Sequence, residues 1–345
     1  MIKVGIAGIG FMGWIHWLAY QEIEGVEVVA ICDTDQKRLS GDWTGIKGNF
    51  GPAGMHVDLS NVAAYDNLDA MCSHDFDLLD ICLPPSFHPA AIEHGLTSDK
   101  HVFCEKPLSL SVEQCDRSVS AAASADRLLM VGHVLPYFPE YSYARSIVES
   151  GEFGKLISGH FKRIISDPTW LPDFFDANKI GGPLLDLHVH DAHFIRLIAG
   201  MPCGVYSSGT TKNDLVSFCH SIFVFPDPNL SIAATSGIIQ QQGRPFTHGF
   251  EIQLEKATMH FEYAALESGD QGMPLKLMKE DGSVEMVDVG DGDPVHAFAA
   301  EIRDVIKALS DNQPMDSLGG AMARDAIKIC HAESQSVLTN QKVTI

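Results

Sequence analysis

Three side chains near the middle of the chain have the types and spacing of an acid–base site. Asp186, His190 and His193 are four and three residues apart, so on an α-helix they share one face. A carboxylate beside two imidazoles suits proton transfer from a substrate hydroxyl. The same three types could form a two-histidine, one-carboxylate metal site, or be a capping acid with two ordinary histidines. We predict proton transfer here and no metal site.

The helix that must position these side chains is marked at both ends. Gly181-Gly182 breaks the preceding loop, and Pro183 suits the first helical position. Apolar residues then recur at helical spacing until Gly200. The pattern predicts one helix over 183–199, on which His188 points elsewhere than the Asp186 face.

The start of the chain has the pattern of a dinucleotide-binding turn. An apolar strand over 2–7 runs directly into Gly8-Ile9-Gly10-Phe11-Met12-Gly13, and helix-forming residues follow. Gly8 permits the tight turn, Gly10 lets the backbone approach a pyrophosphate, and Gly13 lets the helix pack closely on the strand. The spacing predicts a cofactor loop.

An acidic residue stands where a ribose-binding carboxylate is expected. Asp33 follows an apolar strand over 26–32, about twenty residues after the last loop glycine. A carboxylate there binds ribose hydroxyls and repels a 2′-phosphate. We therefore expect NAD as cofactor, with NADP less favoured, although Lys37 and Arg38 lie nearby.

Further apolar strands alternate with helical segments through the first half, which predicts a doubly wound parallel sheet. The strand over 101–104 leads into Glu105-Lys106-Pro107, and Pro107 holds Lys106 out of helical geometry. At the carboxyl end of a strand, the Lys106 ammonium could orient a substrate hydroxyl and lower its pKa. The alternative is a surface lysine paired with Glu105.

The second half changes pattern to consecutive strands joined by short turns. This predicts a largely antiparallel open sheet covered by helices on one face. We place the domain boundary between 1–131 and 132–345, and expect a terminal helix over about 319–338 to pack back on the first domain. The open sheet face predicts a homo-dimer or homo-tetramer.

Composition limits the partners. The formal net charge of −21 argues against nucleic acid or an anionic membrane as the main partner. No apolar run is long enough to span a bilayer. The chain begins directly with a strand, and its eight cysteines are scattered without a C-x-x-C pair. A reduced cytoplasmic enzyme fits these features.

The chain resembles the glucose-fructose oxidoreductase, inositol dehydrogenase and rhizopine-catabolism family of oxidoreductases along essentially its whole length. Four stretches carry the resemblance beyond the glycine loop and Asp33: Pro84-Pro85-Ser86-Phe87-His88, His101 to Leu108 (HVFCEKPL), Gly132-His133 with Phe138-Pro139, and Gly181-Gly182 with Asp186 and His190. The resemblance implies that Lys106, Asp186 and His190 are catalytic, with His190 as proton acceptor.

The resemblance also implies where cofactor and substrate bind. The expected cofactor contacts are Gly8, Gly10, Phe11, Met12, Gly13, Asp33, Leu83, Pro84, Pro85, His88, Glu105 and Lys106. The expected substrate contacts are His133, Tyr137, Trp170, His188 and His193. The family often has glycine at the position of His188 and an acid at that of His193, which leaves the substrate open. Trp170 suits the apolar side of a sugar ring, or it packs its own loop down.

Three functions fit these residues. The first is an NAD-dependent dehydrogenase that oxidises a secondary alcohol of a sugar, cyclitol or sugar derivative. The second is redox-assisted glycoside cleavage that regenerates the cofactor. The third is a non-enzymatic NAD-sensing regulatory protein. The joint presence of Lys106, Asp186 and His190 favours an enzyme.

Overall fold

The computed structural model describes residues 1–290 and 292–345, which form two compact units. The first comprises Met1–Tyr137 and Gly292–Arg324, and the second Phe138–Asp291 and Asp325–Ile345. The division therefore differs from the predicted boundary after residue 131. The chain returns to the first unit after its excursion through the second.

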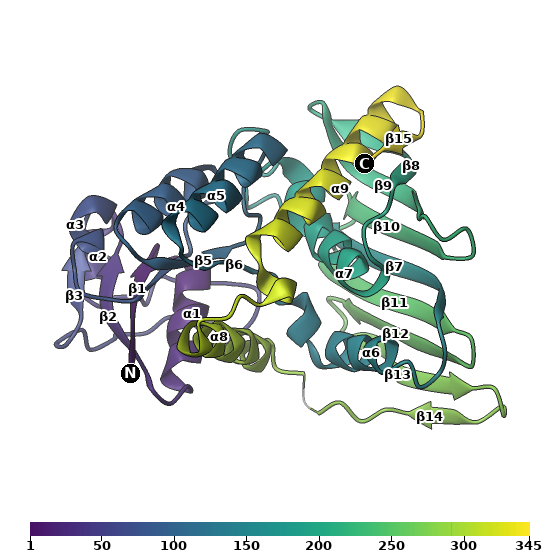
Figure 1. Ribbon diagram of the computed structural model, residues 1–345, viewed down its shortest axis with the longest axis horizontal. Helices are drawn as coiled ribbons and strands as arrows, with labels where there is room; N and C mark the ends of the chain where they lie inside the picture. Colours follow the sequence, from purple (N-terminus) through teal and green to yellow (C-terminus); the bar gives the residue numbers. More distant parts are fainter. Residues whose placement is uncertain (291) are drawn as a thin grey trace. The chain divides into compact units, whose positions relative to one another are not determined.

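The first unit contains a six-stranded sheet in the order β3-β2-β1-β4-β5-β6 (Figure 1). All of its strand pairs are parallel. The predicted doubly wound sheet is confirmed. Its strands are β1 (Ile2–Ala7), β2 (Val26–Cys32), β3 (Ala63–Tyr65), β4 (Leu78–Ile81), β5 (His101–Glu105) and β6 (Leu129–Gly132).

Helices cover both faces of this sheet. Figure 1 shows α4 and α5 on one face and α1 and α8 on the other. The helices of the unit are α1 (Phe11–Gln21), α2 (Gln36–Leu39), α3 (Leu68–Cys72), α4 (His88–Thr97), α5 (Val112–Ala125) and α8 (Pro294–Asp311). The sequence placed α8 in the second domain, but its apolar face packs beside α1, where the Phe298 ring lies 5.6 Å from Phe50 and 5.9 Å from His16.

The glycine-rich composition of residues 41–54 predicts a surface loop. That prediction is wrong for Trp43. Trp43 is fully buried and packs edge-on against Trp14 and Trp17, at ring distances of 5.7 and 5.1 Å. Its indole nitrogen donates to the Arg38 carbonyl at 2.7 Å. Burial of three large aromatic rings outweighs the local turn composition.

The second unit contains a nine-stranded sheet in the order β14-β13-β12-β11-β7-β10-β9-β8-β15. The β7–β10 pair is parallel and its other pairs are antiparallel, so the predicted antiparallel character is confirmed. The strands are β7 (Leu156–Ser166), β8 (Gly204–Lys212), β9 (Leu215–Val224), β10 (Ser231–Ile239), β11 (Phe246–Leu254), β12 (Ala257–Ala265), β13 (Gln271–Lys279), β14 (Val284–Met286) and β15 (Val343–Thr344).

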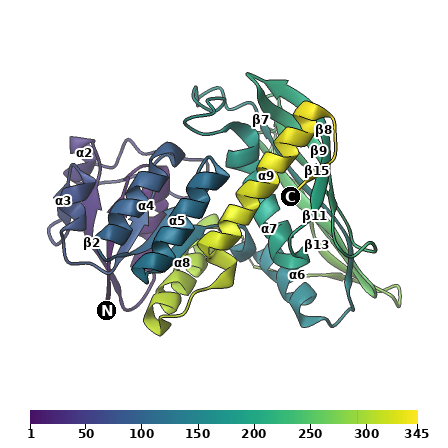
Figure 2. The same cartoon turned by 45° about the horizontal axis from the view of Figure 1, so that its top comes forward.

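The helices of the second unit lie on one face of its sheet. Figure 2 shows α6 (Pro139–Ser150), α7 (Val189–Ala199) and the later part of α9 (Gly320–Thr339) on that side. Burial alternates along β9: Cys219, Ser221 and Phe223 are buried, whereas His220 and Ile222 are exposed. Among the described residues, the side of β9 that carries His220 and Ile222 is therefore exposed.

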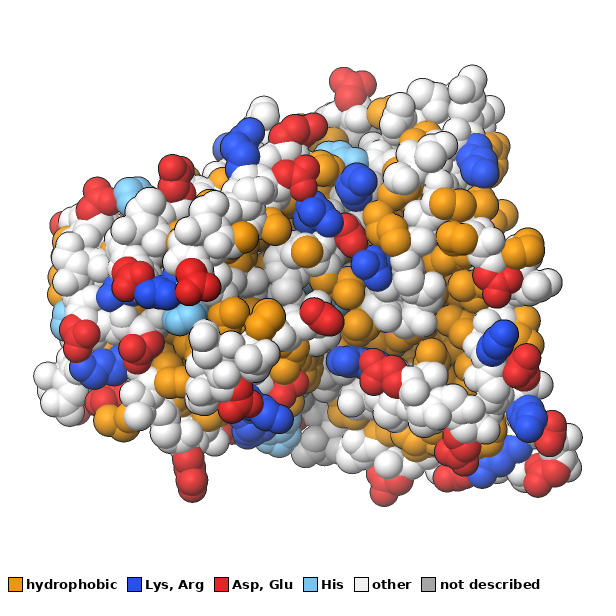
Figure 3. Space-filling model, viewed as in Figure 1, with side chains coloured by type: hydrophobic (Ala, Val, Ile, Leu, Met, Phe, Trp, Pro, Cys, Tyr) orange, Lys and Arg blue, Asp and Glu red, His pale blue; other side chains and the backbone are white. Residues whose placement is uncertain are grey.

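The surface carries charges of both signs. Figure 3 shows acidic and basic side chains scattered among hydrophobic ones on the visible face. None of the helices in the described part of the chain has the length and apolar character needed to cross a membrane.

Candidate functional site

The glycine loop of the first unit has the geometry that its sequence predicts. Gly8 has φ +93°, and a Cβ there would lie 2.7 Å from the Cys82 carbonyl oxygen. A Cβ on Gly13 would lie 2.1 Å from the Gly8 carbonyl oxygen, so only glycine allows α1 to start this close to β1. A Cβ on Gly10 would meet nothing within 4 Å. The loop is therefore closely packed at its two ends and open in the middle, where a pyrophosphate would approach.

Asp33 follows β2 and turns its carboxylate to the same loop. Its Oδ2 accepts the Ile9 N–H at 2.8 Å, and its Oδ1 accepts the Asp35 N–H at 2.8 Å. Arg38 Nη1 lies 3.2 Å from Oδ2. The carboxylate is thus held at the edge of the glycine turn, which suits a ribose contact.

The turn after β4 is held by His88, whose buried ring lies between two backbone carbonyls. Nδ1 is 2.8 Å from the Pro107 oxygen and Nε2 is 2.7 Å from the Leu83 oxygen. Burial is the main cause that lowers the pKa of His88. This ring fixes the Leu83-Pro84-Pro85 turn against the Lys106-Pro107 segment.

Lys106 comes directly after β5, and the Lys106–Pro107 peptide is cis. Its side chain is half-buried, whereas the preceding Glu105 is 5% exposed. Glu105 Oε2 accepts the Lys106 backbone N–H at 3.0 Å, while Oε1 faces His16. Glu105 contacts the backbone of Lys106 and the imidazole of His16, a partner that the sequence did not indicate.

Two predicted substrate contacts of the first unit lie at its end. His133 is buried. The Tyr137 hydroxyl donates to Asp304 Oδ2 on α8 at 3.0 Å, and burial, followed by Glu301 and Asp304, raises its pKa. Tyr137 therefore has a structural partner within its own unit.

The segment with the catalytic pattern differs in one respect from the predicted helix. Residues Leu184–His188 form a π-helical turn, and α7 begins at Val189. A π-turn has a wider repeat, so the α-helical face rule does not hold strictly from Asp186 to His190. Solvent exposure nevertheless distinguishes Asp186 and His190. Between Gly181 and Ile195 they are the two residues that are partly exposed. His193 is fully buried.

His188 contacts Glu333 on α9, a partner that the sequence did not indicate. Nε2 lies 3.0 Å from Glu333 Oε2, and both side chains are almost completely buried. Burial lowers the pKa of His188, but the Glu333 carboxylate more than offsets this and the pKa is raised. This ring anchors the π-turn inside the second unit. Trp170, the remaining predicted contact, is 63% exposed on the loop after β7.

A buried ion pair that the sequence did not reveal supports this segment. Asp191 binds the Arg163 guanidinium through both oxygens, at 2.8 and 3.1 Å. Arg163 comes from β7 and Asp191 from α7, so the pair fixes the first turn of α7 against the sheet. An aspartate next to His190 and an arginine in an apolar strand were the available signals, but their pairing depends on the fold.

A glycine turn between β1 and α1, with an acid after β2, defines the class of Rossmann-type dinucleotide-binding proteins. Residues 2–133 match the family described as "Oxidoreductase family, NAD-binding Rossmann fold". Residues 141–260 match the GFO/IDH/MocA C-terminal domain. The chain belongs to this family, as its motifs predicted.

Relatives differ in what they are named for. The chain is 28% identical over 209 residues to the uncharacterized oxidoreductase YrbE of Bacillus subtilis (60% of this chain, 57% of the relative). It is 28% identical over 199 residues to myo-inositol 2-dehydrogenase of Thermotoga maritima (58% and 55%). It is 32% identical over 168 residues to a glycosyl hydrolase family 109 protein of Shewanella sp. (46% and 34%). The match thus spans about half the length, or less, of these relatives.

A solved structure shows the same fold over the whole chain. Scyllo-inositol dehydrogenase of Lactobacillus casei, with bound NAD(H) and scyllo-inositol, is similar with a TM-score of 0.74 and 20% identity, covering 100% of this chain and 99% of that chain.

Proposed function

We propose that this protein is an NAD-dependent dehydrogenase that oxidises a secondary alcohol of a sugar, cyclitol or sugar derivative. The main observation behind the proposal is that the glycine loop and Lys106 lie at the carboxyl ends of nearby strands in the first unit's sheet. The glycine loop follows β1 and Lys106 follows β5, with β4 between these strands. Two strand spacings separate them by roughly 10 Å, which suits a dinucleotide that runs from the loop toward Lys106.

The residues of the loop fit NAD. The open side of Gly10 and the free helix start at Phe11 leave room for a pyrophosphate, and Asp33 offers a carboxylate to ribose. When bound, the nicotinamide supplies a hydride acceptor. The negative charge of Asp33 favours NAD over NADP, whose 2′-phosphate it would repel.

Proton handling is assigned to three side chains. Lys106 polarises the substrate hydroxyl, His190 accepts its proton, and Asp186 orients His190 or binds a neighbouring hydroxyl. The partial exposure of Asp186 and His190 supports these roles, because a proton acceptor must be reachable by substrate. Trp170, which is 63% exposed, is the most accessible of the proposed substrate contacts, and the others are His133, Tyr137, His188 and His193. The inositol dehydrogenases among the similar proteins support a polyol substrate.

The same residues would serve redox-assisted glycoside cleavage, and the similarity to a glycosyl hydrolase family 109 protein favours this second candidate. Product analysis separates the two. A dehydrogenase accumulates NADH in proportion to product, whereas cleavage with an internally regenerated cofactor releases a sugar without net NADH.

We further propose that the open face of the nine-stranded sheet forms a homo-dimer or homo-tetramer. Ile157 and Ile222 are 40% and 58% exposed on strands of that sheet, and apolar side chains on an uncovered sheet favour association.

The test of the function is a screen of polyols and sugar acids that follows NADH absorbance, with NADP in parallel. Lys106→Met and His190→Ala are expected to bind NAD normally and to lose turnover. His94→Gln, on the exposed side of α4, is the matched control and should keep full activity. Normal turnover in both the Lys106 and His190 variants would overturn the proposed mechanism.

A further inference from the structure

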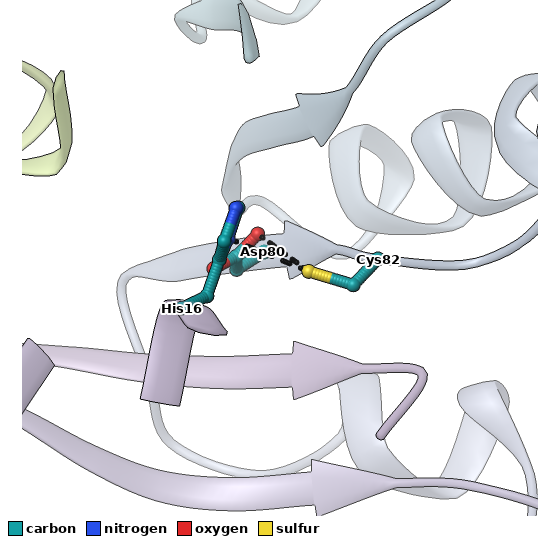
Figure 4. A group of neighbouring side chains, drawn as sticks. All are labelled: His16, Asp80 and Cys82. Atoms are coloured by element: carbon teal, nitrogen blue, oxygen red, sulfur yellow. Dashed lines mark hydrogen bonds and ion pairs between the residues drawn. The ribbon is translucent and has the colours of Figure 1, made fainter. Parts of the chain in front are cut away.

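A buried chain of hydrogen bonds runs from β4 through α1 to β5 inside the first unit. His16 lies on α1 and is fully buried. Its Nδ1 is 2.8 Å from Asp80 Oδ2, and its Nε2 is 3.1 Å from Glu105 Oε1 (the Asp80 side is drawn in Figure 4). Each nitrogen therefore faces a carboxylate oxygen, an arrangement that an imidazolium satisfies by donating from both.

The charge of His16 follows from its neighbours. Burial lowers its pKa, but its neighbours, Asp80 first and then Cys82, together raise it by more, and the pKa lies well above the usual value. The buried ring also stacks on Phe103, at 5.5 Å and 17° between planes. His16 is thus a buried cation held between two carboxylates and an aromatic face.

Other titratable groups face the same ring. The Tyr20 hydroxyl donates to Asp80 Oδ2 at 2.9 Å, and Cys82 Sγ lies 3.4 Å from His16 Nδ1. Glu301, on α8, interacts electrostatically with His16 and Glu105 and is fully buried. Burial first, and then Glu105, raises the pKa of Glu301 well above its usual range. Asp80 and Glu105 are the two carboxyl groups that contact the His16 ring nitrogens directly.

This series of hydrogen bonds ends at the backbone of Lys106. Glu105 Oε2 accepts the Lys106 N–H at 3.0 Å. On the β6 side, a Cβ on Gly132 would lie 3.0 Å from Glu105 Oε1, so β6 leaves no free space beside the carboxylate. Glu105 is held by His16 at one oxygen and holds Lys106 with the other.

We propose that His16, bridging Asp80 and Glu105, is a positioning residue that fixes Lys106 for its work on the substrate hydroxyl. The relevance to turnover rests on the proposed function, in which Lys106 acts on that hydroxyl. The positioning itself belongs to the first unit alone. Loss of the imidazolium leaves Glu105 Oε1 buried without its donor, and a buried carboxylate that loses its cationic partner moves or takes up a proton. Either change disturbs the backbone bond to Lys106.

A metal ion is the competing explanation for this cluster, because His16, Asp80 and Cys82 offer ligand atoms within 4.8 Å of one another. Ligands about 2.0 Å from a tetrahedral zinc ion lie roughly 3.3 Å apart. The 2.8 Å contact between Nδ1 and Oδ2 is shorter than this and has the length of a hydrogen bond. The geometry favours the imidazolium bridge.

The experiment compares His16→Gln, His16→Leu and Asp80→Asn with two controls. His16→Gln keeps one donor for Glu105, whereas His16→Leu removes both donors. Asp80→Asn keeps the ring and removes the anion that holds it charged. Tyr20→Phe removes a different donor from Asp80 and leaves the bridge in place. His94→Gln controls for loss of a histidine elsewhere. Thermal unfolding and NAD affinity show which variants are folded.

The first readout needs no substrate. Trace acetylation of the intact protein, followed by mass spectrometry, gives the labelling rate of Lys106 relative to the other lysines. We expect His16→Leu and Asp80→Asn to change this ratio by about threefold or more, His16→Gln by less, and both controls to leave it unchanged. Because the labelling does not depend on turnover, it tests the positioning even if Lys106→Met shows that the proposed function fails.

The second readout uses the polyol that the screen identifies. A misplacement of about 1 Å costs up to a hundredfold in rate, so His16→Leu should lower kcat by about tenfold to a hundredfold with little change in NAD affinity. In Asp80→Asn the alkaline limb of the kcat–pH profile should move to lower pH, because His16 then loses its proton more easily. Unchanged Lys106 labelling in folded His16→Leu overturns the proposal. The proposal is also overturned if the purified protein contains one equivalent of zinc and the Cys82→Ala variant does not.

Discussion

Arg163 and Asp191 form a two-pronged ion pair inside the second unit, with nitrogen–oxygen distances of 2.8 and 3.1 Å and side chains that are 6% and 1% exposed. The pair joins β7 to the first turn of α7, next to the proposed proton acceptor His190. Asp191→Asn leaves a buried guanidinium without its anion, so we expect a loss of about 3–5 kcal/mol in the free energy of unfolding. Urea denaturation measures it.

The neighbouring residue supplies the control. Lys162 pairs with Glu262 at 2.8 Å, but these side chains are 26% and 42% exposed. Lys162→Met is therefore expected to cost only about 0–1 kcal/mol. Equal losses in the two variants would show that Arg163–Asp191 does not anchor α7.

The His188–Glu333 pair predicts a pH-dependent stability. The pKa of His188 is raised in the folded protein, because Glu333 more than compensates for burial. Its stabilisation is complete below the unfolded pKa of about 6.5 and is lost as pH rises through the folded value. We expect His188→Gln to be destabilised relative to the wild type at about pH 6, and the difference to shrink at about pH 9. Urea unfolding across this range checks the sign, and a constant difference would contradict it.

We expect a substitution of Glu301 to stabilise the folded protein at alkaline pH. Its pKa is raised by burial and by Glu105, and neither carboxyl oxygen has a hydrogen-bond partner within the described residues. Stability due to the neutral acid is present at low pH and falls as pH rises from the unfolded pKa toward the folded one. Glu301→Gln, which cannot ionise, should become progressively more stable than the wild type as pH rises from about 5 to about 9. Thermal unfolding at both pH values decides the point. A variant that is less stable than the wild type at the higher pH would contradict the prediction.

Asp33 predicts cofactor preference. Asp33→Ser removes the charge that would repel a 2′-phosphate while Arg38 stays nearby. A hydrogen bond to a charged group contributes about 1.5–3 kcal/mol, so NADH affinity should fall by about tenfold or more, and the NADPH-to-NADH affinity ratio should rise. Fluorescence titration with both cofactors measures this. Asp35→Asn retains a cap for α2 and serves as control. An unchanged NADPH-to-NADH affinity ratio in Asp33→Ser would show that Asp33 does not contact the ribose.

The open sheet face predicts the effect of a charge on assembly. Ile222 is 58% exposed on β9, and Ile222→Glu should shift the chain toward monomer. Phe87→Glu, also 58% exposed but in the first unit, should not. Sedimentation or size-exclusion with light scattering measures both. A wild type that is already monomeric would contradict the proposed association.

The sequence alone determined the first unit's sheet, the glycine loop and the position of Asp33. These features depend on local rules, since an apolar strand, a glycine turn and a helix start are each readable within a few residues. The antiparallel character of the second unit was likewise readable from its short turns.

Only the tertiary structure decided the partners of the buried charges. His16 meets Glu105 across 89 positions of the chain, and Arg163 meets Asp191 across 28. The return of α8 to the first unit and the burial of Trp43 are of the same kind. Such pairings are set by which faces pack together, and the local pattern of residues carries no information about which distant charge a buried side chain will meet.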